Sequence, residues 1–255
     1  MIHPTAVIHP KAQLGTDCHI GPYCVIGEHV VLGDRCHLHS HVVVDGHTRL
    51  GQENEIFPFA SIGLKTQDLK WQGGVTRTQI GDHNTFRECV TINSGTADGE
   101  ATVVGSNNHI LAYSHVAHNV TLGNGVIMSN VATLAGHITV EDFAVIGGLA
   151  AVHQFCRIGK LSMIGGCSKV VQDVPPFMIV DGNPAETRTI NKVGMERHEV
   201  AESTQTALRQ AFKLLFREGL TIPNALARIE AELPSSPELA HLVNFVRISE
   251  RGISK

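Results

Sequence analysis

Apolar residues recur every six positions from Ile2 to Val170. Counting in sixes over this stretch, 26 of the 29 positions hold Ile, Leu, Val, Met or Phe. A small residue often stands four positions after them, as at Ala132 and Cys156. Neither the period of a helix nor the two-residue alternation of an ordinary strand produces this spacing. The pattern therefore predicts a repeat built from six-residue units.

A coil with three flat faces accounts for this period. Each hexad would supply one short strand and one turn, so three hexads close one triangular rung. Successive rungs pair as parallel strands about 4.8 Å apart, and residues three hexads apart stack into columns. Gly, Asn and Asp accept the positive φ that tight corners require. We predict such a mainly β domain over residues 1–190.

Two stretches interrupt the hexads without changing their phase. The pattern misses at Asp68, Gly74 and Asp98, which indicates loops leaving the coil at Leu64–Gln79 and Ala97–Thr102. The first loop carries the only Trp, an Asp and two Lys. Because long loops with such chemistry are more often functional than plain surface turns, we expect a functional role, with a simple surface excursion as the alternative.

The remainder of the chain is predicted to be a helical domain over residues 191–255. The hexads stop at residues 172–176, where two prolines are expected to end strand pairing. Amphipathic patterns then predict three helices, within residues 200–219, 224–233 and 235–248. The first helix presents Arg209, Lys213 and Arg217 on one face, which is either an ordinary solvated face or a docking surface for an acidic partner.

Composition excludes several classes of protein. The net charge is −4, with 42% apolar and 17% charged residues, so we expect a globular protein and no nucleic-acid binding. No apolar run approaches the ~20 residues of a membrane helix, and the first residues lack a secretory pattern. The cytoplasm is therefore expected. The six Cys form no CxxC pair, so we predict reduced, buried thiols.

Column arithmetic selects a candidate site. His118, Gly136 and Gln154 are each three hexads apart and should share one edge of the coil. An imidazole beside a residue without a side chain suits general-base work, and the Gly136 N–H could stabilise an oxyanion. By rung count, three further histidines lie near them: His115, His137 and His153. With 16 His in the chain, a structural scaffold with histidines merely decorating its turns is the alternative.

Several motifs carry a family resemblance. The hexads, Gln67–Lys70 (QDLK), 115–118 (HVAH), 134–137 (LAGH), 152–156 (VHQFC), 165–168 (GGCS), 182–185 (GNPA) and the helical tail together resemble the UDP-N-acetylglucosamine acyltransferases of lipid A biosynthesis. The resemblance implies a left-handed parallel β-helix with a C-terminal helical domain. It also implies a homotrimer without cofactor, an acyl carrier protein bearing a 3-hydroxyacyl chain as donor, and the glucosamine 3-position of a UDP-sugar as acceptor.

The resemblance also implies roles for individual residues. His118 would be the general base and Gly136 the oxyanion donor. Asp68 and Lys70 would contact the sugar, reaching towards a neighbouring subunit, and Gly166 would leave room for an acyl chain of roughly C12–C14. The remaining implied substrate contacts are His115, His137, His153 and Gln154, with Asn191 and Arg197 near the nucleotide.

Three positions depart from the family pattern. Asn119 stands where Asp is usual after the general base, Asn93-Ser94-Gly95 replaces His-Arg-Gly, and His198 replaces a second Arg. The departures keep open an alternative reaction, N-acylation of a 3-amino UDP-sugar. Metal-dependent hexapeptide enzymes carry an HxxxxH ligand pair, and no two histidines here are five apart, so no metal is expected.

Overall fold

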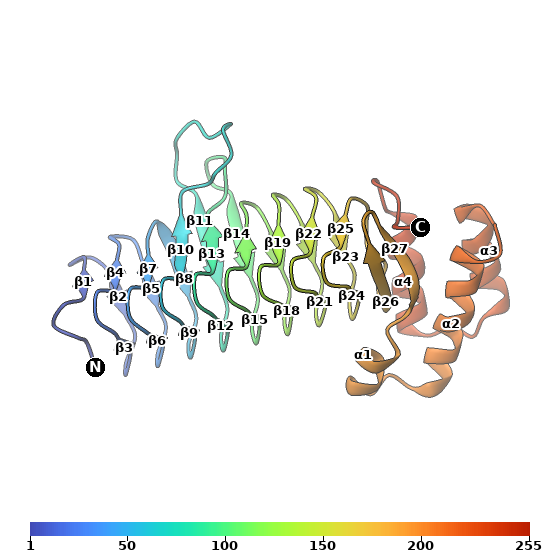
Figure 1. Ribbon diagram of the computed structural model, residues 1–255, viewed down its shortest axis with the longest axis horizontal. Coiled ribbons are helices and arrows are strands. Elements are labelled where there is room, and N and C mark those ends of the chain that lie inside the picture. Colours follow the sequence, from blue (N-terminus) through green and yellow to red (C-terminus); the bar gives the residue numbers. More distant parts are fainter.

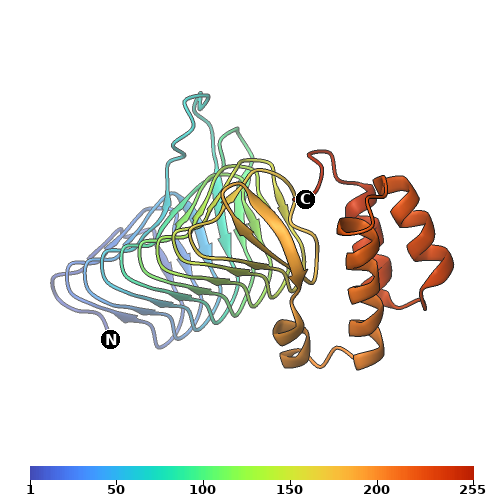
Figure 2. The ribbon, with the colours of Figure 1, turned by 45° about the vertical axis from the view of Figure 1, so that its right-hand side comes forward.

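The computed structural model describes residues 1–255 as a long three-sided coil with helices packed at its C-terminal end (Figure 1). A view closer to the coil axis shows the triangular outline of the stacked rungs (Figure 2). Three parallel sheets run the length of the coil, one along each side. This confirms the left-handed parallel β-helix followed by helices that the hexads and the resemblance predicted.

The first sheet has nine strands and carries His115 on its outer face. Its strands, in spatial order, are β1 (Val7–Ile8), β4 (Val25–Ile26), β7 (Val43–Val44), β10 (Ser61–Leu64), β13 (Thr91–Asn93), β16 (His115–Val116), β19 (Thr133–Leu134), β22 (Ala151–Val152) and β25 (Lys169–Val170).

The second sheet has eight strands and follows the edge at which the candidate site lies. Its strands are β2 (Gln13–Leu14), β5 (Val31–Leu32), β8 (His47–Leu50), β11 (Arg77–Ile80), β14 (Ala101–Val104), β17 (Thr121–Leu122), β20 (Thr139–Val140) and β23 (Arg157–Ile158).

The third sheet has ten strands and ends in an antiparallel pair. Its strands, taken in chain order, are β3 (His19–Ile20), β6 (His37–Leu38), β9 (Glu55–Ile56), β12 (Thr85–Phe86), β15 (His109–Ile110), β18 (Ile127–Met128), β21 (Val145–Ile146), β24 (Met163–Ile164), β26 (Met178–Gly182) and β27 (Ala185–Ile190).

The register shows why the loops preserve the columns. Val116 pairs with Leu134, three hexads later, as the triangular rung requires. Phe86 pairs with Ile56 and with Ile110, at separations of five hexads and four hexads. Three hexads make one rung, so the first loop adds two hexads to the spacing and the second loop adds one. Each loop therefore adds a whole number of hexads. Every later strand therefore keeps its inward residue.

The axis of the coil is filled by 40 buried residues, nearly all aliphatic, with Phe86 the largest. Polar columns stack among them. The amide oxygen of Asn54 accepts from both the backbone and side-chain N–H groups of Asn84, at 3.0 and 2.9 Å, and the Asn84 oxygen accepts from the backbone of Asn108. The amide oxygens of Asn54, Asn84 and Asn108 thus each accept from the next rung, which offsets much of the cost of burying them, although Nδ2 of Asn108 has no partner.

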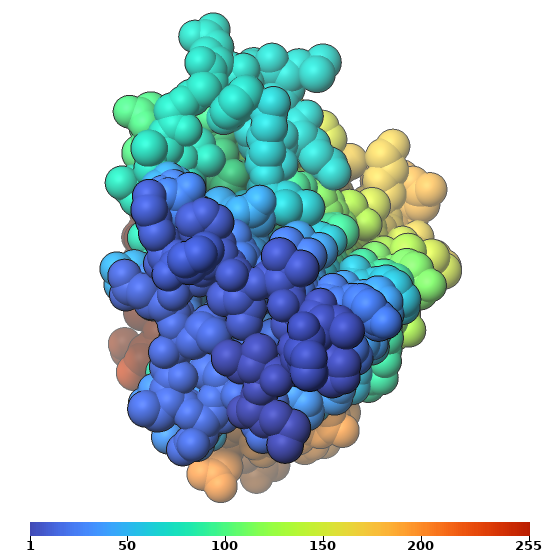
Figure 3. Space-filling model, turned by 90° about the vertical axis from the view of Figure 1, so that its left-hand side faces the viewer, coloured from blue at the N-terminus to red at the C-terminus, as the bar shows by residue number.

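The bounds of the two loops differ from those that the sequence indicated. The first loop covers residues 65–76 rather than 64–79, because β10 runs to Leu64 and β11 begins at Arg77. The second loop covers 94–100 rather than 97–102, because β13 runs to Asn93 and β14 begins at Ala101. Buried threonines at 48, 78 and 102 extend the strands here beyond the hexad pattern. Seen from the N-terminal end, the loops stand above one edge of the prism (Figure 3).

The C-terminal region departs from the prediction at two points. The prolines at 175 and 176 do not end the third sheet, because β26 pairs with β24 beyond them and β27 folds back on β26. A short helix that the pattern missed, α1 (Lys192–Arg197), then precedes α2 (Glu202–Phe216), α3 (Ile222–Glu232) and α4 (Pro237–Arg247). None of these helices has the length and hydropathy needed to cross a bilayer.

The cysteines form no disulfide. Cys18, Cys24, Cys36 and Cys156 are buried as expected, and the largest effect on the Cys24, Cys36 and Cys156 thiols is burial, which raises their pKa, to about 11 at Cys156. Cys167 is exposed, which differs from the expectation, because it occupies a corner with φ of 60°.

Candidate active site

The three residues predicted to share a column follow strands β16, β19 and β22 at one edge of the prism. Their corners are stacked by hydrogen bonds. The N–H of His137 donates to the carbonyl of His118, and the N–H of Phe155 donates to the carbonyl of Gly136, both at 3.1 Å. The structure thus brings the rungs of His118, Gly136 and Gln154 together in the predicted order.

The imidazole of His118 lies directly against Gly136. A Cβ added to Gly136 would lie 2.5 Å from Nε2 of His118 and closer still to Cε1. Only glycine leaves room for the ring in this position. Gly136 is buried, and its N–H donates to no acceptor in the chain.

The hydrogen bonds of His118 define which ring nitrogen is the base. Its Nδ1 lies 3.0 Å from Oδ1 of Asn119, and the backbone N–H of Thr96 donates to the same oxygen at 3.1 Å. A backbone N–H can only donate, so this atom of the amide is the oxygen. Nδ1 of His118 must then carry the proton, which leaves Nε2 with a free lone pair.

The first loop brings an acidic side chain to that lone pair. Oδ2 of Asp68 lies 3.8 Å from Nε2 of His118, and both side chains are mostly buried, 21% and 13% exposed. The other carboxylate oxygen, Oδ1, accepts from the backbone N–H of Lys70 at 2.9 Å. Asp68 thus lies beside the histidine of its own chain, and the reach of this loop towards a neighbouring subunit stays a prediction. The Lys70 side chain is exposed.

Two further histidines surround His118. His115 shares a 2.7 Å hydrogen bond between Nδ1 and Oγ1 of Thr91. The ring of His137 stands edge-on to His118, with centroids 5.1 Å apart, and stacks on Phe155. Burial, and secondly the neighbouring His118, lowers the pKa of both His115 and His137. Both are therefore neutral at pH 7 and can act as polar contacts without adding charge.

His153, Gln154 and Gly166 are exposed. His153 Nδ1 lies 3.1 Å from the Gln154 carbonyl oxygen and 3.3 Å from the guanidinium Nη2 of Arg251. Gly166 stands at a different edge, where a Cβ would meet only the Gly148 carbonyl, at 3.3 Å. A larger side chain at 166 would therefore extend outwards from the coil.

Asn191 and Arg197 lie apart from this cluster, at the two ends of α1. Asn191 is buried and both of its side-chain groups are occupied. Its Oδ1 accepts from the N–H of Gly194 at 3.0 Å, and its Nδ2 donates to the Leu161 carbonyl at 2.9 Å. Asn191 is therefore a helix cap, whereas Arg197 is exposed. Contact of either residue with a nucleotide stays a prediction.

Asn93 and Ser94, which depart from the family pattern, anchor the loops. Asn93 and Ser94 are buried. Nδ2 of Asn93 donates to the Lys65 carbonyl at 2.9 Å, and Ser94 Oγ shares a 3.0 Å hydrogen bond with Thr76 Oγ1. They thus join the second loop to the base of the first rather than contacting His118.

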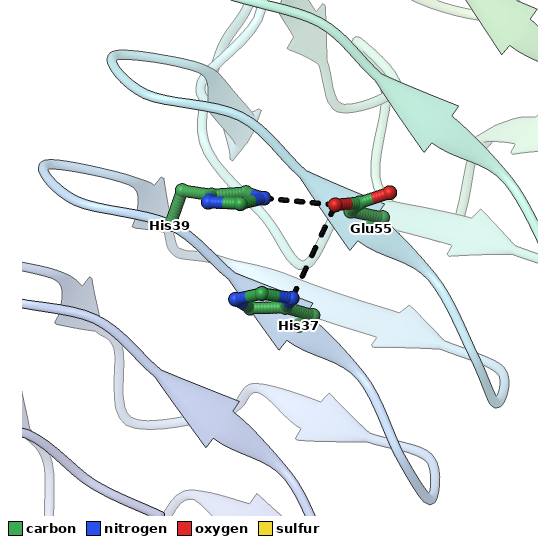
Figure 4. Close-up of side chains that lie close together, drawn as sticks. All are labelled: His37, His39 and Glu55. Atoms are coloured by element: carbon green, nitrogen blue, oxygen red, sulfur yellow. Dashed lines mark hydrogen bonds and ion pairs between the residues drawn. The ribbon is translucent and has the colours of Figure 1, made fainter.

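The chain has one group of three side chains close enough to share a metal ion: His37, His39 and Glu55, on and beside β6 and β9 of the third sheet (Figure 4). Nε2 of His39 lies 2.9 Å from Oε1 of Glu55, and Nδ1 of His37 lies 4.0 Å from the same oxygen. The two rings stack, with planes 27° apart. We interpret the group as a hydrogen-bonded pair, His39 and Glu55, with His37 stacked beside it.

Sequence reasoning missed Thr96 and Glu100, which both contact Asn119. They belong to the second loop, where the hexads break. The only available signal was an acidic residue inside that interruption, and the period does not show in which direction an interrupted segment folds.

Comparisons with known proteins agree with this geometry. The C-terminal residues 173–254 match the family model described as UDP-N-acetylglucosamine O-acyltransferase, domain 2. Residues 11–46 match the model for the bacterial transferase hexapeptide, six repeats.

Solved structures match over the whole chain. LpxA from Acinetobacter baumannii is 44% identical, with a TM-score of 0.96, and the match covers 100% of this chain and 99% of that one. The UDP-N-acetylglucosamine acyltransferase from Bacteroides fragilis is 40% identical, with full coverage of both chains and a TM-score of 0.97. The UDP-N-acetylglucosamine O-acyltransferase from Moraxella catarrhalis is 39% identical over 100% and 99% of the two chains, with a TM-score of 0.95. The chain therefore belongs to the UDP-N-acetylglucosamine O-acyltransferase family.

Proposed function

We propose that the chain transfers a 3-hydroxyacyl group from acyl carrier protein to the glucosamine 3-hydroxyl of UDP-N-acetylglucosamine, the first step of lipid A biosynthesis. Membership in the family supports the reaction class. The observation that carries the mechanism is the contact between His118 and Gly136, because it places a free imidazole Nε2 beside a free backbone N–H.

The proposed reaction begins with His118. Nε2 accepts the proton of the acceptor hydroxyl while the oxygen attacks the thioester carbonyl, forming a C–O bond. The resulting imidazolium keeps its Nδ1–H bonded to the amide oxygen of Asn119 and lies 3.8 Å from the Asp68 carboxylate. Breakage of the C–S bond then releases the thiol, which takes the proton back from Nε2.

The tetrahedral intermediate carries a negative oxygen that needs a donor. The Gly136 N–H, which has no partner in the chain, is the proposed donor. A backbone N–H held by the rungs on either side is preorganised for this work. In the same proposal Asp68, Lys70, His115, His137, His153 and Gln154 contact the substrates, and Asn191 and Arg197 lie towards the nucleotide.

One observation favours a second acceptor, a 3-amino UDP-sugar. Asn119 is neutral, so it stabilises the imidazolium of His118 less than a carboxylate would. An amine is a better nucleophile than a hydroxyl and needs less help from a base. N-acylation would therefore tolerate this substitution more readily than O-acylation.

The proposed assembly is a homotrimer with sites between subunits. One edge of the prism supports this proposal, because its corner residues form an exposed apolar column. Tyr23, Phe59, Tyr113, Val131 and Leu149 are 41–64% exposed. A column of this kind along a whole edge is typical of a surface that another chain covers.

The same proposal names acyl carrier protein as the donor and the cytoplasm as the compartment. Arg209 and Lys213 lie exposed on α2 and Arg217 is exposed at its C-terminal end, which suits an acidic carrier protein. Six unpaired cysteines suit the reducing cytoplasm.

To test the proposal, the purified protein is given hydroxyacyl carrier protein with either UDP-N-acetylglucosamine or a 3-amino UDP-sugar. The rates of His118→Ala and His109→Ala are then compared. His109 is exposed on β15 of another sheet and serves as the matched control. We expect His118→Ala to lose about 10²- to 10⁴-fold in kcat and His109→Ala to keep the wild-type rate. Full activity of His118→Ala with either acceptor would refute the mechanism, and the preferred acceptor distinguishes ester from amide formation.

A further inference from the structure

Asn119 is held in one orientation from several sides. It occupies a corner with φ of 60°, and its backbone N–H donates to Oγ1 of Thr102 at 2.9 Å. Its side-chain Oδ1 accepts from the Thr96 N–H, and its Nδ2 donates to Oε2 of Glu100 at 2.7 Å. The amide therefore bridges the second loop and the imidazole of His118.

Glu100 is the charged end of this bridge. Its Oε2 also accepts from the backbone N–H of Ala97 at 2.8 Å. That hydrogen bond, followed by the one from Asn119, lowers the pKa of the Glu100 carboxyl, so it is ionised at neutral pH. An ionised carboxylate can only accept hydrogen bonds.

The charge makes a flipped amide costly. A flip would turn the Asn119 oxygen towards the Glu100 carboxylate and the NH₂ group towards the Thr96 N–H and His118. Acceptor would then meet acceptor, and donor would meet donor, at distances of about 3 Å. The flipped amide would also favour the wrong tautomer of His118, with the proton on Nε2 and no lone pair for the acceptor.

We infer that Glu100 is a positioning residue of the acyl transfer: through Asn119 it keeps the proton of His118 on Nδ1. It also supplies, one hydrogen bond further away, the negative charge that an aspartate at 119 would have placed beside the ring. The short charge-assisted bond between Asn119 and Glu100 polarises the amide and strengthens its oxygen as an acceptor for the imidazolium. The inference rests on the proposed role of His118.

The experiment moves the negative charge between positions 100 and 119. Three variants are compared with wild type for kcat and KM: Glu100→Gln, Asn119→Asp, and the two together. Glu100→Gln keeps size and hydrogen-bonding capacity and removes only the charge. Asn119→Asp alone places two carboxylates against each other. The double variant leaves one carboxylate, now beside His118. Asp98→Asn, in the same loop and with its acceptor oxygen retained for the Val75 N–H, is the control for loss of charge.

We expect Glu100→Gln to lower kcat by about 10- to 100-fold, the range seen when an outer partner of a functional histidine is lost, with KM within about two-fold. Asn119→Asp alone should be similarly slow, and the double variant should recover to within about three-fold of wild type, because its single carboxylate fixes the tautomer directly. The Asp98→Asn control should keep its rate. Recovery in the double variant shows that Glu100→Gln acts on the tautomer and not on the fold of the loop.

Two results would overturn the inference: wild-type kcat in Glu100→Gln, or a double variant as slow as the product of the two single effects. The proposed function is tested separately by His118→Ala. If His118→Ala is inactive while Glu100→Gln is fully active, only the role of Glu100 fails. If His118→Ala is active, the general base itself is wrong.

Discussion

We expect Gly136→Ala to lower the activity of the protein and to leave its stability nearly unchanged. The new Cβ would lie 2.5 Å from His118 Nε2, whereas ordinary contacts begin at 3.4 Å. The ring must therefore retreat by about 1 Å, a displacement that can cost about 10²-fold in rate. The obstacle is a side chain rather than backbone, so the fold can yield. Weakening the His118–Asn119 hydrogen bond should lower the free energy of unfolding by about 0.5–1.5 kcal/mol. Replacing Gly by Ala should raise it by about 0.4–1 kcal/mol, because Ala restricts the unfolded chain.

The assay measures kcat with hydroxyacyl carrier protein and UDP-N-acetylglucosamine, together with the free energy of unfolding in urea. We expect a loss of about 10²-fold in kcat with a change of less than about 1 kcal/mol in stability. Gly159→Ala is the contrasting control, because its Cβ would meet the backbone of Pro176, including Cα at 2.6 Å. That variant should lose stability while its folded fraction keeps the wild-type rate.

The outcome that refutes this reasoning is a Gly136→Ala protein with wild-type kcat. Such a protein would show that the imidazole need not rest against the backbone at residue 136. A Gly136→Ala protein that unfolds would contradict the claim that only a side chain must move.

Three further predictions concern specificity, pH and the buried ladder. Gly166→Leu should shift the preferred donor from roughly C12–C14 to shorter hydroxyacyl chains, measured as kcat/KM across a donor series, with a small change in Tm, because the added Cβ would meet one backbone atom, the Gly148 carbonyl oxygen at 3.3 Å. Burial lowers the pKa of His115 and His137 below the ordinary value of 6.5, so below that pH the unfolded chain binds more protons than the folded one. The free energy of unfolding should then fall as the pH drops through 6.5, and His115→Gln should reduce that slope in urea titrations. Asn84→Ala should cost about 1–3 kcal/mol in the same titrations, because it leaves buried partners in the asparagine column unpaired.

Much of the fold follows from one period. Residues three hexads apart must stack, so the placement of His118 over Gly136 could be predicted without any structure. The hexad period could not predict β26 and β27, because they no longer follow it. It also missed α1, whose six residues include Gly194 and bury only Met195, too short an element for an amphipathic pattern to emerge.

The surroundings of His118 were less predictable, for a physical reason. Asp68, Thr96 and Glu100 lie in the two loops, where the period that places other residues is interrupted. Asp68 entered as a candidate through family resemblance alone. Thr96 and Glu100 reach Asn119 through contacts that depend on loop conformation, which only the structure shows.

Both loops add whole hexads to the spacing between paired strands, and this has an engineering consequence. At this edge the chain accommodates one or two added hexads, because the extra residues leave the coil as a loop and the strands on either side keep their pairing. Inside the strands and turns of the coil, by contrast, an insertion or deletion that is not a whole number of hexads would put the following aliphatic side chains on the wrong face and expose them to solvent. Grafted recognition segments that are one, two or three hexads long should therefore leave the downstream architecture in step when they are placed at this edge.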